Sequence, residues 1–209
     1  KVYGLAKNYE AHAQFMHESG HSEIAHAPED MVIFSKPSTS VIGPDDPIVI
    51  PSYSNDMNFE PEVAVVMGRI AKNVSVENAM DYVLGFTCVN DVTLRDLQGI
   101  DPTWTRAKGF DTSCPLGPWI VMRDDLDWKD AKISFTLNGE DVPMASGTTA
   151  NLIHGIPEQI AAISSFSTLL PGDVIMTGTP NASGPLDPGD DGIVHVEGIG
   201  DLRNVIVRA

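Results

Sequence analysis

The chain has 209 residues, 42% of them hydrophobic and 20% charged, and its 13 Lys and Arg against 29 Asp and Glu give a formal net charge of −16. This composition fits one globular domain over residues 1–209 and is too apolar for a disordered chain. The apolar runs are far shorter than the roughly 20 residues of a membrane helix. No cluster of Lys and Arg offers a surface for nucleic acid or an anionic membrane, so we expect neither as a partner.

The two cysteines, Cys88 and Cys114, are too few for a disulfide framework and have no metal-binding spacing. We interpret both as buried small apolar residues. This cysteine usage suits a reducing compartment, and no signal peptide is recognisable, so a cytoplasmic location is the default expectation.

The first predicted element is a short amphipathic helix over residues 8–16, which contains His12. Residues 17–29 follow without apolar periodicity and are predicted to form a mobile loop. We therefore expect a mobile lid segment over residues 10–30.

Strands are predicted next over residues 31–35, 47–50 and 61–68. At the start of the last one, Glu60 and Glu62 would share one face, about 7 Å apart at Cα. Carboxylates this close must be solvated at a strand end, neutralised by cations or gathered around a metal ion. The same face continues with Ala64 and Val66, which makes the solvated position less favourable.

A helix over residues 76–82 and a strand over 82–90 lead to a third carboxylate, Asp91. An Asp that leaves a buried strand is well placed for a site, and the alternative is that it caps the short helix that follows. Three carboxylates suit Mg²⁺ or Mn²⁺, which prefer oxygen ligands.

The remaining elements are strands over residues 118–122, 132–137, 173–177, 193–196 and 204–208 and a helix over 157–165. The pair Asn138 and Gly139 predicts a hairpin turn. With 18 Gly and 15 Pro dividing the chain into short apolar runs, the fold class is α+β, rich in strands with few short helices.

Motifs along nearly the whole chain resemble those of the fumarylacetoacetate hydrolase family in its short, single-domain form. They comprise Asn8, Tyr9 and His12, residues 34–39, Glu60 and Glu62 with residues 90–98, and residues 104–111, 137–140, 171–180 and 198–204. The resemblance implies a mixed β-sheet roll, a homodimer, and Mg²⁺ or Mn²⁺ held by Glu60, Glu62 and Asp91.

The resemblance also implies a metal-dependent enzyme that acts on a small 2-oxo acid, in β-diketo or dienol form, through a metal-stabilised enolate. The expected reaction is C–C bond hydrolysis or decarboxylation, on acylpyruvate, fumarylpyruvate or oxaloacetate, as in the catabolism of aromatic compounds. The alternatives are an isomerase of 5-carboxymethyl-2-hydroxymuconate or 2-hydroxyhepta-2,4-diene-1,7-dioate and, from another class, a catalytically degenerate metal-binding scaffold.

Residue roles follow from the resemblance one position at a time. The implied catalytic residues are His12 and Lys108, and the implied substrate-binding residues are Arg95, Gln98, Gly178 and Thr179. The alternatives are a solvated surface lysine at position 108, a structural ion pair between Arg95 and an Asp, and an ordinary turn at Gly178 and Thr179.

The sequence departs from the family pattern beside His12. Family hydrolases place a Glu three residues further on, where this chain has Phe15. Glu18 and His17 are the candidate substitutes, but neither lies on the His12 face of a regular helix. Hydrolysis is therefore put in doubt, whereas decarboxylation needs only a proton donor and tautomerisation needs an acid and a base but no activated water.

Overall fold

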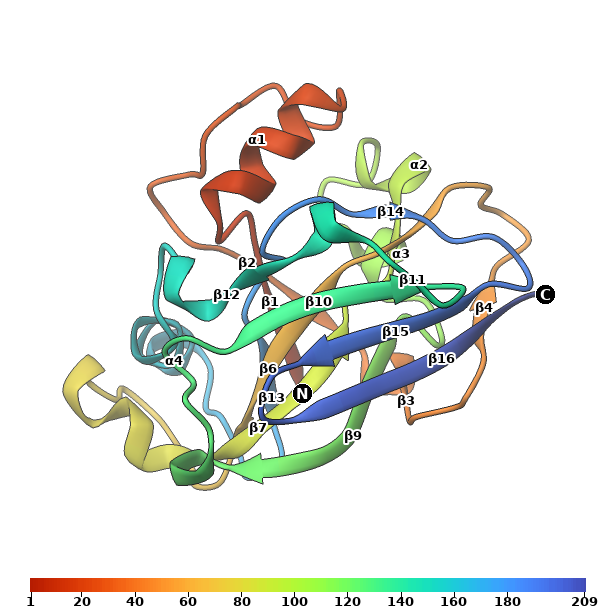
Figure 1. Cartoon of the computed structure of the whole chain (residues 1–209). Helices are drawn as coiled ribbons and strands as arrows, with labels where there is room; N and C mark the ends of the chain where they lie inside the picture. The colour runs from red at the N-terminus through yellow and green to blue at the C-terminus, as the bar shows by residue number, and fades with distance from the viewer.

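The computed structural model describes residues 1–209, arranged in three β-sheets with few helices (Figure 1). The seven-stranded sheet contains, in spatial order, β2 (Val32–Lys36), β1 (Val2–Ala6), β13 (Val174–Met176), β6 (Pro61–Met67), β7 (Val83–Asn90), β9 (Cys114–Met122) and β3 (Val41–Ile42). The six-stranded sheet contains β11 (Glu140–Asp141), β10 (Lys132–Leu137), β15 (Asp191–Val196), β16 (Gly200–Arg208) and β4 (Ile48–Ile50), with β12 (Gly147–Thr148) also paired to β10. The three-stranded sheet contains β14 (Gly184–Pro185), β5 (Met57–Phe59) and β8 (Thr93–Leu94).

The helices are short and lie around the sheets. The α-helices are α1 (Glu10–Glu18), α2 (Arg95–Gln98), α3 (Thr105–Lys108) and α4 (Ile156–Phe166). Five 3₁₀ turns are η1 (Ser38–Ser40), η2 (Val76–Tyr82), η3 (Arg123–Asp125), η4 (Pro143–Ala145) and η5 (Thr149–Asn151). Figure 1 shows α1 and α2 at the same end of the molecule, with α4 on another side. No helix is long and apolar enough to cross a membrane.

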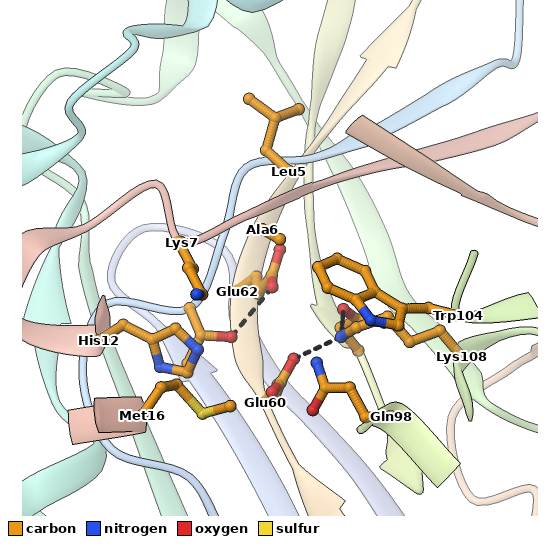
Figure 2. A pocket seen from close by; sticks show the side chains of 12 residues that line it. Leu5, Ala6, Lys7, His12, Met16, Glu60, Glu62, Gln98, Trp104 and Lys108 are labelled. Atoms are coloured by element: carbon orange, nitrogen blue, oxygen red, sulfur yellow. Dashed lines mark hydrogen bonds and ion pairs between the residues drawn. The ribbon is translucent and has the colours of Figure 1, made fainter. Parts of the chain in front are cut away.

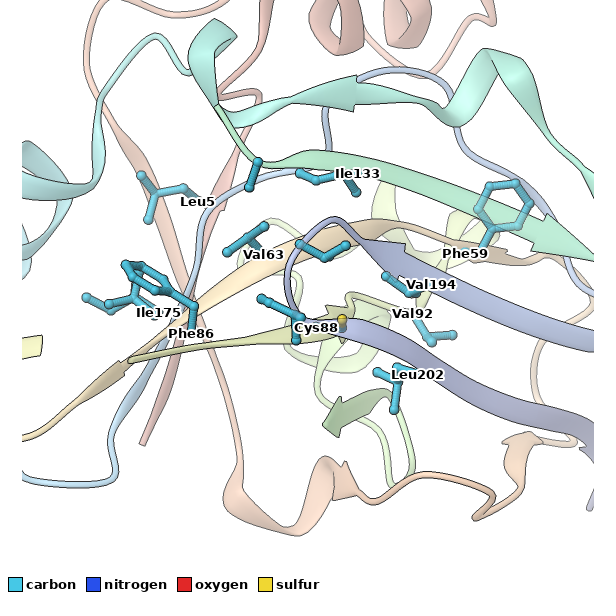
Figure 3. Close-up of a cluster of buried hydrophobic side chains, with 14 of the residues drawn as sticks. Leu5, Phe59, Val63, Phe86, Cys88, Val92, Ile133, Ile175, Val194 and Leu202 are labelled. Atoms are coloured by element: carbon cyan, nitrogen blue, oxygen red, sulfur yellow. The ribbon is translucent and has the colours of Figure 1, made fainter. Parts of the chain in front are cut away.

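The alternating side chains of β6 point into two separate apolar clusters. Val63, Val65 and Met67 belong to the main core of 32 buried residues, which joins the two larger sheets (Figure 3). Ala64 and Val66 point the other way, into a second cluster of eight buried residues. Every residue of β6 is buried, which explains why an apolar residue occupies each position after Glu62. Full burial of each large apolar side chain contributes about 1.5–3 kcal/mol to the free energy of folding. Strand β6 therefore fixes the position of Glu60, the residue that precedes it.

The predicted fold class is confirmed: the molecule is rich in strands, with few short helices. Each predicted strand corresponds to an observed one, and the predicted helix over residues 157–165 is α4. The helix predicted over residues 8–16 begins later, because Tyr9 has an extended backbone, and it continues to Glu18. Residues 76–82 form a 3₁₀ helix. Cys88 and Cys114 are buried and free, as predicted, and burial raises the pKa of each thiol to about 12.

Several sheet elements differ from the expectation: the short strands β3, β5, β8, β12 and β14 were not predicted, and two longer strands differ as follows. Strand β9 begins at Cys114 rather than at residue 118, because its proline-containing first half pairs with β3 on one side and, after a register shift, with β7 on the other. Strand β1 was not predicted, because it is short and its partner β13 lies far along the chain.

Candidate metal centre and active site

Three carboxylates meet where β6 begins and β7 ends. The two strands are antiparallel with Pro61 opposite Asn90, so Glu60 before β6 lies beside Asp91 after β7. The Asp91 N–H donates to the Glu60 carbonyl oxygen at 2.9 Å. One carboxylate oxygen from each of Glu60, Glu62 and Asp91 lies within 4.8 Å of the others. The sequence-predicted ligand set therefore lies together.

Burial decides between the alternatives for these carboxylates. Glu60, Glu62 and Asp91 are 3%, 2% and 1% exposed, so the solvated strand end is wrong. Asp91 does not cap the following helix either, because α2 begins at Arg95 and Leu94 is its N-cap residue. Buried charges of one sign require cations close by.

Protein cations neutralise two of the three carboxylates. The Lys108 ammonium lies 2.8 Å from Glu60 Oε2 and 2.5 Å from Asp91 Oδ2, and Lys36 Nζ lies 2.8 Å from Asp91 Oδ1. The Arg95 guanidinium pairs with the other oxygen of Glu60. Burial raises the pKa of Glu60, but Arg95 and Lys108 outweigh it and hold that pKa well below its usual range.

Glu62 has no such cation. Its carboxylate accepts hydrogen bonds from the Gly178 N–H at 2.7 Å and the Thr179 hydroxyl at 3.0 Å. Burial, with the nearby charges of Asp91 and Glu60, raises the pKa of Glu62 well above its usual range. An all-oxygen donor set with one carboxylate left uncompensated fits a hard divalent cation such as Mg²⁺ or Mn²⁺. These three residues could hold such an ion.

A pocket opens on the acidic cluster, and His12 and Met16 of α1 form part of its wall (Figure 2). Its lining residues are Leu5, Ala6, Lys7, His12, Met16, Glu60, Glu62, Asp91, Gln98, Trp104, Lys108 and Thr179. The cavity holds about 20 Å³, enough for an ion or one water molecule but not for an organic acid.

His12 is 6% exposed and is fixed in one orientation. Its Nδ1 lies 2.5 Å from the Asn181 carbonyl oxygen, an acceptor only, so Nδ1 carries the ring proton. Nε2 is then the free, basic nitrogen. Burial lowers the pKa of His12, partly opposed by the charge of Glu60. The ring is therefore a neutral base in the pocket wall.

Neither candidate substitute on α1 gives His12 a carboxylate partner. Phe15 lies against the imidazole, with ring centroids 6.4 Å apart. Glu18 is exposed and accepts a hydrogen bond from Gln14 Nε2 at 2.8 Å. His17 is also exposed.

The other predicted residues divide into those that line the pocket and those that support it. Lys108 is 2% exposed, so the surface alternative is wrong. Gln98 lines the pocket and accepts from Arg95 Nη1 at 2.6 Å, whereas Arg95 lies behind it and pairs with a Glu rather than an Asp.

Thr179 lines the pocket beside Gly178, and the position of Gly178 requires glycine for two reasons. Its φ of +107° lies in the region that favours glycine. A Cβ added there would also lie 2.9 Å from the Asn8 side chain, which is too close for an ordinary contact.

Several residues that build the pocket were not assigned a role in the sequence analysis. They are Lys7, Met16 and Trp104 in the pocket wall, and Lys36, Thr93, Asn181 and Ser183 behind it. A lysine at the end of an apolar strand was a usable signal for Lys36, which is 3% exposed. The others come from segments whose contacts depend on the folded chain.

Known proteins share both the sequence and the fold of this chain. The family model described as fumarylacetoacetate (FAA) hydrolase C-terminal matches residues 1–207. The chain is 45% identical to a solved structure, the 5-carboxymethyl-2-hydroxymuconate delta-isomerase from Mycobacterium smegmatis, with a TM-score of 0.89, over 100% of this chain and 79% of that one. It is 37% identical to the mitochondrial oxaloacetate tautomerase Fahd2a of Rattus norvegicus, over 99% of this chain and 66% of the relative.

A third similar protein is the fumarylpyruvate hydrolase of Pseudomonas aeruginosa, whose structure is a complex with Mn²⁺ and pyruvate. Identity is 27% and the TM-score 0.87, over 100% of this chain and 89% of that one. The β-rich fold and the buried acidic cluster thus define a class whose similar members are isomerases, tautomerases and hydrolases. The chain belongs to the fumarylacetoacetate hydrolase family.

Proposed function

We propose that this chain is a divalent-metal-dependent enzyme that interconverts the keto and enol forms of a small 2-oxo acid of the oxaloacetate type. The observation that carries the proposal is His12, a neutral imidazole whose Nδ1 is bonded to the Asn181 carbonyl oxygen and whose Nε2 is free in the pocket wall. Such a base moves protons on carbon and oxygen. Activation of water for hydrolysis lacks the carboxylate partner, because α1 has Phe15 beside the ring.

Each pocket residue has its own role in the keto–enol conversion. Gln98 and Thr179 orient the oxygens of the substrate. His12 Nε2 removes a proton from C3, and the electron pair of the C–H bond moves toward the 2-oxo oxygen. The protonated imidazole then returns the proton to that oxygen, which gives the enol with atoms and charge balanced. The Lys108 ammonium stabilises the intervening negative charge.

Glu60, Glu62 and Asp91 would hold the metal ion. When bound, it would supply positive charge that stabilises the enolate. The relatives support this chemistry: the rat relative is named an oxaloacetate tautomerase, and the Pseudomonas structure contains Mn²⁺ together with pyruvate, itself a 2-oxo acid.

The experiment follows oxaloacetate in the presence of Mn²⁺ by enol absorbance and by exchange of the C3 hydrogens with D₂O. We expect turnover that stops with chelator and falls at least about a hundredfold in His12→Gln, the usual range for loss of a general base. The exposed His21→Gln variant is the matched control and retains the wild-type rate.

The same reaction mixtures distinguish the alternative reaction. Release of CO₂ at the rate of enol formation would identify a decarboxylase in place of a tautomerase. Turnover that survives in His12→Gln or in chelator would contradict the proposal.

A further inference from the structure

Lys7 is a cation of the pocket wall that the proposed chemistry does not use. It follows β1 and is half-buried beside the acidic cluster. Figure 2 shows it on the His12 side of the pocket, across Glu60 and Glu62 from Lys108 and Trp104. Lys108 is paired with two carboxylates, whereas Lys7 makes no ion pair and donates to the Ser22 hydroxyl at 2.6 Å. An unpaired pocket ammonium is unusual in a chain with 29 acidic residues and 13 Lys and Arg.

The backbone holds Lys7 in this place. Its φ of +54° lies in the left-handed region, which is unfavourable for a residue other than glycine. The adjacent Asn8 fixes the chain by donating to the His154 and Thr177 carbonyl oxygens and accepting from the His154 N–H. Lys7 is thus directed by a strained and anchored segment, unlike a lysine on a free surface.

The chemistry that fits Lys7 is a carboxylate. Under the proposed function, the 2-oxo group and its own carboxylate are bound at the acidic cluster. A second carboxylate on the same substrate would face a protein of net charge −16 and needs a cation of its own. Lys7 is the pocket-lining cation without an acidic partner.

We propose that Lys7 binds the second carboxylate of a dicarboxylic 2-oxo acid, replacing its bond to Ser22, and so selects diacids over monoacids. This rests on the proposed function and assigns the residue that recognises the second carboxylate of its substrate. Burial lowers the pKa of Lys7, and a bound carboxylate would raise it again, which favours the paired state.

The test compares two acids of equal chain length, oxaloacetate with two carboxylates and 2-oxobutyrate with one. Binding to the Mn²⁺-loaded protein is measured by calorimetry, and C3 hydrogen exchange by NMR. For Lys7→Met we expect affinity for oxaloacetate to fall about tenfold or more, the usual worth of a charged hydrogen bond, while 2-oxobutyrate changes less than about twofold. Lys7→Arg should restore most of the preference.

Two further variants separate this role from others. Lys129→Met makes the same change of charge at an exposed position and should leave both affinities unchanged. Ser22→Ala removes the partner of Lys7 and should keep the diacid preference. Equal losses for both acids in Lys7→Met, or the same loss in Ser22→Ala, would show that Lys7 only holds the structure and would overturn the proposal.

Failure of the proposed function gives a different result. If the wild-type protein binds oxaloacetate more tightly than 2-oxobutyrate but exchanges the C3 hydrogens of neither, the proposed reaction is wrong, and the calorimetric comparison still decides the role of Lys7. If it binds both acids equally, the selection of diacids is overturned whatever the reaction.

Discussion

The buried imidazole of His12 determines how far activity of the proposed reaction extends toward low pH. Burial lowers its pKa below the ordinary value of about 6.5, and Glu60 only partly opposes this. Because the neutral ring is the base, activity should persist to lower pH than for an exposed histidine. We predict that the acidic limb of the pH profile of kcat/KM for oxaloacetate lies below about pH 6.5. A limb above that value would contradict the role of the neutral ring.

Lys108 is the cation shared by Glu60 and Asp91, and its removal should affect the metal-free protein most. Lys108→Met leaves two buried carboxylates short of a partner, so we predict a loss of about 3–5 kcal/mol of unfolding free energy without metal. Excess Mn²⁺ should recover much of this loss, because it supplies the missing positive charge. Denaturant unfolding with and without Mn²⁺ measures both, with Lys129→Met as control. An equal deficit in the two conditions would contradict the shared-cation argument.

Among single residues, the three carboxylates of the site were easier to predict from sequence than the lysines near them. The spacing of Glu60 and Glu62 on a strand, and the place of Asp91 after the next one, depend on local periodicity, which sequence shows directly. Lys7 could not be assigned, because its contact with Ser22 joins segments that meet only in the folded chain, and for Lys36 the sequence offered only its place at the end of an apolar strand.

Among the helices and strands, α1 is the one that differs from the family pattern, with Phe15 where the hydrolases have a Glu. Phe15 lies against His12, so a carboxylate at that position would give the imidazole the charged partner it lacks. We predict that Phe15→Glu raises hydrolysis of acetylpyruvate, followed by loss of its enol absorbance. Gln14→Glu adds the same charge at an exposed neighbouring position and should have no effect. An unchanged rate in Phe15→Glu would show that the missing Glu does not limit hydrolysis.

Elements with strong periodicity or clear end signals were predicted well, and those defined by long-range pairing were not. Strands β6 and β7 are mostly apolar, and α4 begins with a proline in its first turn. Strand β1 is only five residues long, and the first half of β9 contains two prolines, which lack an N–H and normally exclude a strand. Their neighbours in the sheet supply the pairing that local sequence does not reveal.

For the whole molecule, the homodimer expected from the family resemblance remains a prediction. An apolar groove of about 470 Å³ runs along the outer sheet surface beside Trp119 and Ile120, which are 61% and 45% exposed. We predict that this surface forms the dimer, and that salt strengthens it by screening the net charge of −16. Sedimentation should show Trp119→Glu as a monomer, with the exposed Ile70→Glu unchanged. A monomeric wild-type protein at all salt concentrations would contradict this prediction.

The order of strands in the seven-stranded sheet has a consequence for synthesis of the chain. Strand β13 lies between β1 and β6, with Val174 paired to Val2 on one side and to Val66 on the other. A nascent chain that ends before Val174 would therefore hold two separate part-sheets with unpaired edges. His12 follows β1, whereas Glu60 and Asp91 flank β6 and β7. The pocket is thus completed only after most of the chain has left the ribosome, and its folding should be slow for its size.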